Sequence, residues 1–247
     1  MNKFNKQIIL LNEVESTNNY ANQLILSDAA EECTVVLARY QLRGKGQQGN
    51  TWESEYGKNL LMSMILYPDF LEAAKQFLIS KVVSLAIIEF LQTETDNVSI
   101  KWPNDIYVGK NKIAGILIEN SLKGMNMFSS IIGIGLNLNQ ETFFSDAPNP
   151  VSLKQITGKD YEIQITAELL IKNIISWYTK LKEYKKTEID SEYESNLYGY
   201  NQWSIYSVQG KTFEARIFGI GEFGQLKLEK RDGTVSEYMF KEVEFIL

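Results

Sequence analysis

The chain has 247 residues, of which 44% are hydrophobic and 23% are charged, and its formal net charge is −6. This length accommodates one large domain and a small one, and the composition excludes a disordered or collagen-like chain. The acidic balance argues against a duplex nucleic-acid binder, because such proteins usually carry a basic face.

Histidine is absent and Cys33 is the only cysteine. The lack of imidazole excludes histidine general bases, serine–histidine triads and most zinc catalysis. A single cysteine forms no internal disulfide, so we expect Cys33 to fill core space in a reducing compartment. The N-terminal apolar run is too short for a signal peptide and no run reaches the length of a membrane span. We therefore expect a cytoplasmic protein without a membrane partner.

The N-terminal part of the chain predicts three strands and two helices. Apolar, partly β-branched runs predict strands over 7–14, 33–40 and 59–67. Ser16 is expected to be the N-cap of a first helix. From 69 to 92 apolar residues recur at helical spacing and predict a second helix.

Four strand-like runs follow at 98–102, 105–108, 112–120 and 128–139. Their short connections favour antiparallel pairing, so we expect an α+β fold with a mixed β-sheet rather than a doubly wound one.

The C-terminal part predicts two helices and then a small all-β unit. Helices are expected near 166–186 and 191–197. After residue 200 short alternating runs are separated by glycine, which indicates a small antiparallel barrel. We therefore divide the chain into a catalytic domain, 1–199, and a C-terminal β-barrel domain, 200–247.

A glycine-rich loop, "RGKGQQGNTWES", lies between two predicted strands at 43–54. Its glycines let backbone N–H groups approach a ligand, and Lys45 offers a cation. The loop matches neither a Walker A motif nor the dinucleotide fingerprint. By itself it fits an anion cradle and a mobile surface turn.

The segment "KWPNDIYVGKNKIAGILIEN" carries more chemistry. Asn104 and Asp105 after Pro103 are oxygen ligands of the kind Mg²⁺ prefers, although a proline-anchored turn uses the same residues. Lys112 enters an apolar strand and is either solvated or a fixed charge for a carboxylate or phosphate. Gly115 would let a ligand lie against bare backbone.

Two further stretches are polar at element ends. "STN" at 16–18 fits helix capping and also a urea- or amide-like ligand. "IGIGLNLN" at 132–139 fits either a strand close to another backbone or a groove wall with Asn137 at its rim.

Taken together, "ESTN", "QLRGKGQQGNTWES", "KWPNDI", "KIAGILIE" and "IGIGLNLN" resemble, in order and spacing, the motifs of the biotin protein ligases along nearly the whole chain. Lipoate–protein ligases share that fold but lack the "KWPND" and "KxAGIL" pair. The resemblance implies a class II aminoacyl-tRNA synthetase/biotin ligase-like domain, with a central mixed sheet flanked by helices, and an Src homology 3-like C-terminal barrel. The family's repressor branch carries an N-terminal helix-turn-helix domain. This sequence begins at the catalytic domain, so no DNA binding is expected.

The resemblance also implies the reaction, its cofactors and its partner. Biotin would be activated with ATP and Mg²⁺ as biotinyl-5'-AMP and transferred to a lysine of a biotin carboxyl carrier protein, the natural candidate being the carrier domain of an acetyl-CoA carboxylase. Such acyl transfer needs positioning and electrostatic stabilisation more than a proton shuttle. Catalytic roles would fall to Lys112 and Asp105, and Mg²⁺ to Asn104 and Asp105. The biotin site would comprise Ser16, Thr17, Asn18, Gln41, Gly44, Lys45, Gly46, Gln47, Lys112, Gly115, Ile116 and Leu117. The ATP and adenylate site would comprise Arg43, Lys45, Trp52, Asn104 and Asn137.

The loop departs from the arginine-rich pattern that family members often carry. Lys45, Gln47, Gln48 and Asn50 stand at the corresponding positions, so three cations are missing and Arg43 is expected to compensate in part. Because charge-assisted bonds are stronger than neutral ones, we expect the adenylate to be held less tightly.

Two rival functions share this fold: a lipoate or octanoate transferase, and a non-catalytic ligand-binding module on the same sheet. The "KWPND" motif disfavours the first, and Lys112 with Asn104 and Asp105 disfavours the second. Family members often dimerise through the sheet edge, and the sequence leaves a homodimer open.

Overall fold

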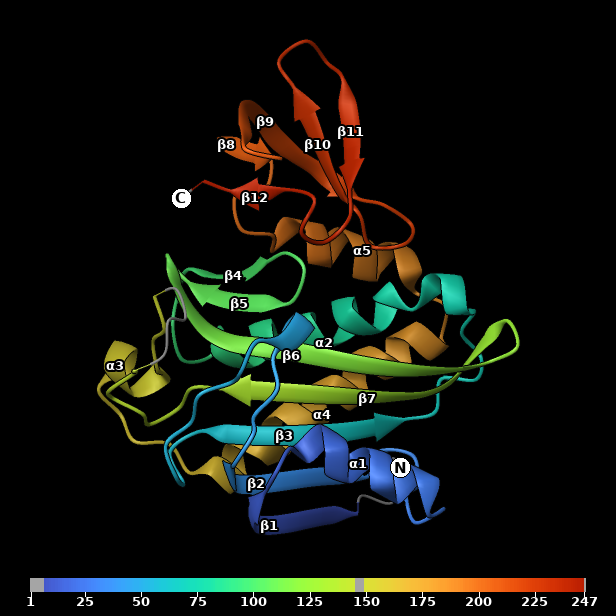
Figure 1. Cartoon of the computed structure of the whole chain (residues 1–247), viewed down its shortest axis with the longest axis vertical. Coiled ribbons are helices and arrows are strands. Elements are labelled where there is room, and N and C mark those ends of the chain that lie inside the picture. Colours follow the sequence, from blue (N-terminus) through green and yellow to red (C-terminus); the bar gives the residue numbers. More distant parts are fainter. Residues whose placement is uncertain (1–6, 145–148, 247) are drawn as a thin grey trace.

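The computed structural model describes residues 7–144 and 149–246. A seven-stranded mixed sheet, in the order β1-β2-β3-β7-β6-β5-β4, forms the centre of the larger part (Figure 1). Its strands are β1 (Ile8–Val14), β2 (Val35–Gln41), β3 (Leu60–Leu66), β4 (Val98–Lys101), β5 (Asp105–Val108), β6 (Asn111–Lys123) and β7 (Asn126–Leu136). Only the β1–β2 pair is parallel, and the four strands from β4 to β7 pair antiparallel in succession, as their short connections predict.

Helices cover both faces of this sheet. They are α1 (Thr17–Leu26), α2 (Phe77–Leu91), α3 (Leu153–Thr157), α4 (Ile163–Lys182) and α5 (Lys186–Ser195). Figure 1 shows α1 on one face and α2, α4 and α5 on the other. The alternation within β2 reflects this arrangement, because Val35 and Leu37 join the core under α2 and α4, whereas Val36 joins the smaller core under α1.

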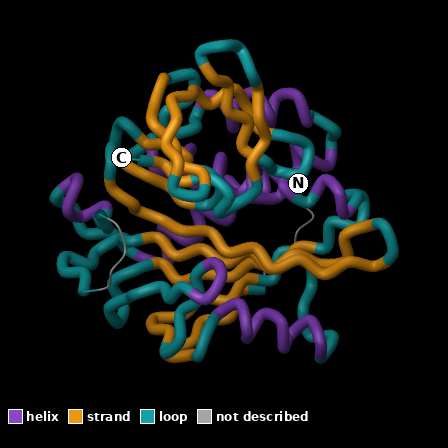
Figure 2. Tube along the Cα trace, turned by 45° about the horizontal axis from the view of Figure 1, so that its top comes forward, coloured by secondary structure: helices purple, strands orange, loops and turns teal. Residues whose placement is uncertain are grey.

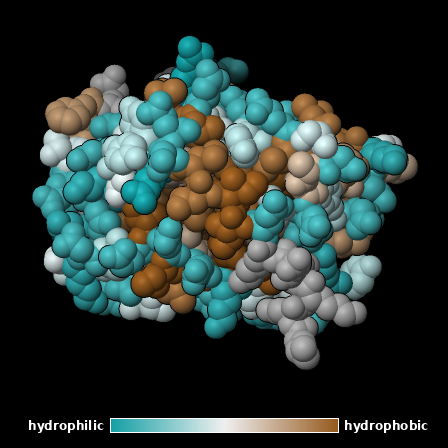
Figure 3. All heavy atoms as spheres, turned by 90° about the horizontal axis from the view of Figure 1, so that it is seen from below, coloured by the Kyte–Doolittle hydropathy of each residue, from teal (hydrophilic) through white to brown (hydrophobic). Residues whose placement is uncertain are grey.

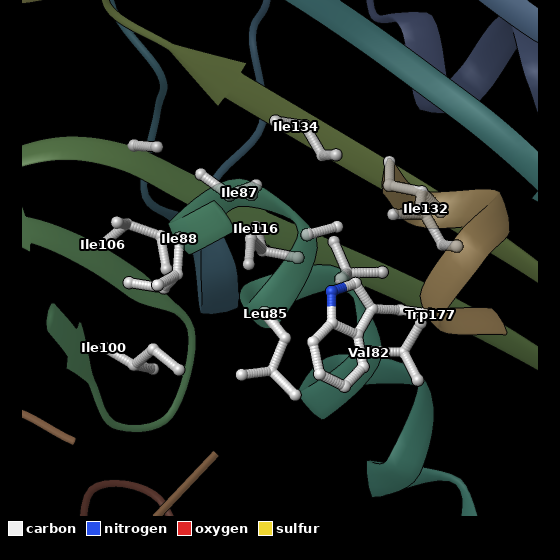
Figure 4. Close-up of a cluster of buried hydrophobic side chains, with 14 of the residues drawn as sticks. Val82, Leu85, Ile87, Ile88, Ile100, Ile106, Ile116, Ile132, Ile134 and Trp177 are labelled. Carbon is white, nitrogen blue, oxygen red and sulfur yellow. The ribbon is translucent and has the colours of Figure 1, made fainter. Parts of the chain in front are cut away.

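The main core lies between α2 and the sheet. In the close-up of Figure 4, Val82 and Leu85 of α2 point toward Ile116 and Ile132 of β6 and β7, with Trp177 of α4 alongside. All but two of the fifteen residues of α2 are buried, which explains why its sequence is predominantly apolar. Cys33 is fully buried in the same core.

The C-terminal part is a five-stranded antiparallel sheet in the order β11-β10-β9-β8-β12, consistent with the predicted small barrel. Its strands are β8 (Trp203–Val208), β9 (Lys211–Ile220), β10 (Leu226–Lys230), β11 (Val235–Tyr238) and β12 (Glu244–Phe245). It lies beside α5 and the β4–β5 edge of the large sheet (Figures 1 and 2). The α+β architecture agrees with the sequence, and the exact domain boundary at 199/200 stays a prediction.

Three helix predictions need correction. The helix predicted from residue 69 begins at Phe77, because the preceding segment bonds to the β6–β7 hairpin, with Ala73 N donating to Met125 O. The helix predicted to reach 186 ends at Lys182, because Tyr184 adopts a left-handed conformation with φ of 59°. The next helix consequently occupies Lys186–Ser195 instead of 191–197.

The short helix α3 was not predicted. Ser152 and Gln155 form a capping box at its start, in which each side chain accepts a bond from the other residue's backbone N–H.

Strand β1 is an edge of the large sheet and carries exposed apolar side chains. Ile8 is 42% exposed and Leu10 is 46% exposed. Figure 3 views the molecule from this side and shows apolar side chains gathered in the middle of the face. None of the helices in the described part of the chain has the length and apolar character needed to cross a membrane.

Candidate active site

A pocket of about 570 Å³ lies between the glycine-rich loop, the face of β6 and β7 that α1 covers, and the C-terminal barrel. Most of the site residues predicted from the sequence line it: Ser16, Thr17, Asn18, Gln41, Lys45, Gly46, Gln47, Trp52, Asn104, Asp105, Lys112, Gly115, Ile116 and Leu117. Segments separated by about a hundred positions in the chain therefore converge on one cavity.

Three predicted residues do not line the pocket. The Arg43 side chain is 82% exposed and lies 4.0 Å from Glu15, so its charge is not directed to the cavity. Gly44 is buried behind Trp52, where an added Cβ would lie 2.5 Å from the Trp52 carbonyl oxygen. Asn137 is only 3% exposed and donates to the Val151 carbonyl at 3.1 Å.

At one end of the pocket Thr17 fixes the orientation of Gln41. Both the backbone N–H and the hydroxyl of Thr17 donate to Gln41 Oε1, at 2.8 and 3.1 Å. The Gln41 amide nitrogen makes no hydrogen bond within the described residues and remains a donor for a polar ligand. Ser16 occupies the N-cap position of α1, but its hydroxyl makes no capping bond, contrary to the sequence prediction.

Asn18 is held by the protein itself. Its amide nitrogen donates to Glu119 at 2.7 Å and to the Leu117 carbonyl at 3.3 Å, and its oxygen lies 2.6 Å from the Ser63 hydroxyl. An added Cβ on Gly133 would collide with the Asn18 amide, so this glycine makes the arrangement possible. Sequence reasoning missed Ser63, although it is the one polar residue in the buried strand β3. Asn18 therefore holds Glu119, the Leu117 backbone and Ser63 in place beside the pocket.

The floor of the pocket is a pair of glycines covered by Trp52. Gly115 of β6 and Gly135 of β7 are register partners, and the indole of Trp52 lies on both. A Cβ on Gly115 would lie 2.8 Å from Trp52 Cζ3, and one on Gly135 would lie 2.6 Å from Trp52 Nε1. Trp52 Nε1 is buried and has no hydrogen-bond partner among the described residues. The absence of a side chain at both glycines therefore lets the flat indole lie against the strand backbone.

Lys112 and Asp105 form an ion pair beside this floor, with 2.6 Å between Nζ and Oδ1. Their side chains are 21% and 23% exposed, and the Lys112 ammonium lies 5.7 Å from the centre of the Trp52 ring. Asn104 is fixed next to them, because its amide donates to the Ile116 carbonyl at 2.8 Å. The pair supplies a positioned positive charge for an anionic ligand.

Asp105 and Asn104 provide one carboxylate and one amide oxygen for a metal ion. No group of three His, Cys, Asp or Glu side chains suited to a metal occurs in the described residues. This small oxygen set fits Mg²⁺, which takes its remaining ligands from phosphate and water. It does not fit a cation held by protein ligands alone.

The glycine-rich loop folds back on itself above the pocket. Lys45 and Thr51 form a β-bridge, and a 3₁₀ turn, η1 (Gln47–Gly49), lies between them. Lys45 Nζ lies 3.9 Å from Glu119, so the loop is tied to β6. Gln47 Oε1 is buried without a partner among the described residues.

The remaining wall comes from the C-terminal barrel, for which the sequence left two roles open, completing the ATP site or only capping the fold. Phe240, Val243 and Phe245 line the pocket together with Lys101 and Trp102. Trp102 Nε1 donates to the Gly224 carbonyl at 2.9 Å and thereby joins the large sheet to the barrel. Lys101 and Trp102 belong to the "KWPND" motif, but the sequence assigned no function to them. No sequence signal identified the barrel residues.

Comparison with known proteins shows which family the chain is similar to. Residues 10–137 match the model of the biotin/lipoate A/B protein ligase family. The bifunctional ligase/repressor BirA of Bacillus subtilis is 30% identical over 241 residues, covering 94% of this chain and 72% of the relative. The biotin–[acetyl-CoA-carboxylase] ligase of Paracoccus denitrificans is 32% identical over 184 residues, covering 71% and 74%.

The fold is also similar to that of a solved structure, the biotin protein ligase from Aquifex aeolicus in complex with biotin and ATP. The TM-score is 0.81 at 26% identity, and the alignment covers 98% of this chain and 99% of that one. The family match, the similar relatives and the similar fold confirm the resemblance stated from the sequence. The chain belongs to the biotin/lipoate A/B protein ligase family.

Proposed function

We propose that this protein is an ATP-dependent biotin–protein ligase. In the first step an oxygen of the biotin carboxylate attacks the α-phosphorus of ATP, and the bond to the β-phosphate breaks, giving biotinyl-5'-AMP and pyrophosphate. In the second step a lysine amine of a carrier domain attacks the acyl carbon, forming an amide and releasing AMP. The names of the relatives and the complex of the Aquifex protein with biotin and ATP support this function.

The observation that carries the proposal is the Lys112 ammonium, held by Asp105 at 2.6 Å beside the Trp52 floor. Both steps place negative charge on carboxylate and phosphate oxygens, and a preorganised cation in a partly enclosed site stabilises that charge. A chain without histidine carries out such chemistry because positioning and electrostatics supply most of the effect.

We assign the ureido end of biotin to Thr17 and Gln41, where a free amide donor faces the pocket. Trp52 is assigned to the adenine and to the wall of the biotin site. Two buried polar atoms of pocket residues, Gln47 Oε1 and Trp52 Nε1, have no hydrogen-bond partner among the described residues and fit groups that bond to a ligand.

Mg²⁺ would be held by Asp105 and Asn104 together with the phosphates of ATP. When bound, it neutralises phosphate charge during nucleotide transfer. Asp105 and Asn104 also have roles that do not require Mg²⁺. Asp105 orients Lys112, and Asn104 fixes the corner between β4 and β5 through its hydrogen bond to the Ile116 carbonyl.

The proposed macromolecular partner is the biotin carboxyl carrier domain of a carboxylase, in the cytoplasm. No role in DNA binding is proposed. The sequence left a homodimer open, and no homodimer is proposed.

The function is tested by measuring ATP–pyrophosphate exchange in the presence of biotin, lipoate or octanoate. We expect exchange with biotin and none above background with the two fatty acids. Exchange that prefers lipoate or octanoate would indicate the transferase activity of the wider family. Absence of exchange with all three acids would indicate a binding protein without turnover.

A further inference from the structure

Lys101 is a further cation in the pocket, besides Lys45 and Lys112, and it has no role in the two proposed steps. Its side chain is half-buried at the end of β4 and lines the cavity on the side of the C-terminal barrel. Its ammonium donates to the Tyr107 hydroxyl at 3.2 Å and lies 4.9 Å from the Tyr107 ring centre and 5.5 Å from that of Phe245.

Within the described residues no carboxylate is in ion-pair contact with Lys101, because the nearby Asp105 pairs with Lys112. Burial, and secondarily repulsion from Lys112, lower the pKa of Lys101 despite an opposing contribution from Asp105. A partly desolvated ammonium without a counter-ion is unfavourable for the protein alone and becomes favourable when an anion binds.

The order of strands places three functional groups in a row across the pocket. Thr17 and Gln41 lie at the β2 side, Lys112 is on β6, and Lys101 is on the edge strand β4. Lys112 and Lys101 are two strands apart, a backbone separation of roughly 10 Å that two lysine side chains and a phosphate chain together span. A ligand with its ureido end at Gln41 and its reacting carboxylate at Lys112 therefore extends its phosphates toward Lys101.

We propose that Lys101 binds the β- and γ-phosphates of ATP, the portion that leaves as pyrophosphate, while Lys112 serves the carboxylate and the α-phosphate. This inference rests on the proposed ligase function. When the α–β bond breaks, its electron pair moves to the bridging oxygen, which stays with the β-phosphate, and the added negative charge develops beside the Lys101 ammonium. Lys101 is thus a leaving-group residue for the first half-reaction only.

The barrel contributes to this subsite through its wall. Phe245 of β12, together with Tyr107 of β5 in the large sheet, shields the ammonium from water, which strengthens its attraction to phosphate. Lys241 and Glu244 of the barrel line the same side, but both are exposed and carry opposite charges. The half-buried Lys101 is therefore the main anion-binding group on this wall.

The test separates the two half-reactions in Lys101→Met and in the control Lys110→Met, an exposed lysine in the next turn. Biotin-dependent ATP–pyrophosphate exchange gives the KM for ATP and for pyrophosphate. Single-turnover transfer from preformed biotinyl-5'-AMP to a carrier domain gives the rate of the second step, which contains no pyrophosphate.

We expect Lys101→Met to raise both KM values roughly ten- to a hundredfold, the effect of losing one charge-assisted contact, and to leave the transfer rate unchanged. Lys101→Arg keeps the charge and is expected to retain KM values near those of the wild type, and Lys110→Met to match the wild type in both assays. If Lys101→Met does not fold, Lys101→Gln, which keeps a polar tip for Tyr107, replaces it.

Unchanged KM values for ATP and pyrophosphate, or an equal loss in exchange and transfer, would overturn the assignment. A wild-type protein without biotin-dependent exchange would instead refute the ligase function on which the assignment rests.

Discussion

The glycine floor beneath Trp52 gives the sharpest test of how the pocket is built. A Cβ on Gly135 would overlap the fused part of the indole, with Nε1 at 2.6 Å and Cδ2 at 2.7 Å. On Gly115 it would meet one edge atom, Cζ3, at 2.8 Å. Neither glycine has a positive φ, so alanine fits the strand backbone and the perturbation is confined to the ring.

Gly135→Ala should displace Trp52 into the space that we assign to biotin. Overpacking of this kind costs about 1–3 kcal/mol, which corresponds to a biotin Kd weakened roughly 5- to 150-fold. Gly115→Ala should have a smaller effect, because a slight tilt of the ring relieves contact with a single edge atom. Isothermal titration with biotin alone measures both Kd values.

The matched control is the same pair of substitutions in a Trp52→Leu background. If the methyl group acts through the indole, Gly135→Ala should weaken biotin binding much less in that background than in the wild type. An undiminished loss in the Trp52→Leu background, or an unchanged Kd for Gly135→Ala, would refute the account of the floor.

Three further predictions concern the loop and the core. Gln47→Arg should slow the release of biotinyl-5'-AMP, because an arginine adds a charge-assisted bond to the neutral loop, and an off-rate equal to that of the wild type would show that this position does not hold the adenylate. Burial raises the pKa of Glu32 above its ordinary value, so the folded state binds the proton more tightly than the unfolded chain does. The free energy of unfolding therefore falls as the pH rises from about 4.5 through the raised pKa. Glu32→Gln should therefore raise the urea midpoint at pH 7 more than at pH 4, and equal shifts at both values would contradict this explanation. Lys81→Ala should destabilise the fold by about 1.5–3 kcal/mol in urea titrations, because Asp190 loses its partner at 2.7 Å and keeps only Lys186 at 3.4 Å. A loss below about 1 kcal/mol would show that the pair contributes little.

Much of the fold was predictable because its strands are locally encoded. The apolar runs that become β2 and β3 and the short connections from β4 to β7 are visible in the sequence. The start of α2 could not be predicted, because the apolar residues before Phe77 have helical spacing. In the structure this segment forms backbone hydrogen bonds to the distant β6–β7 hairpin, such as that from Ala73 to Met125. Non-local hydrogen bonds of this kind override local periodicity.

Site residues that belong to a sequence motif could be predicted, whereas site residues that only the packing of distant elements brings to the pocket could not. Lys112, Asp105 and Trp52 were named from the sequence, and the structure brings them into one pocket. Arg43 was expected to compensate for missing loop cations, yet its side chain faces outward near Glu15. The barrel wall depends on how two sheets pack, and neither sheet's local pattern specifies that contact.

The measurement that tests the central claim most directly is biotin-dependent ATP–pyrophosphate exchange by the wild type and by Lys112→Ala. Removal of one preorganised charge from such a site typically costs about 100- to 1,000-fold in rate. We predict a loss of this size for Lys112→Ala, with exchange by Lys110→Ala equal to that of the wild type. Exchange by Lys112→Ala at the wild-type rate would contradict the claim that the Lys112–Asp105 pair is the chemical centre of this pocket.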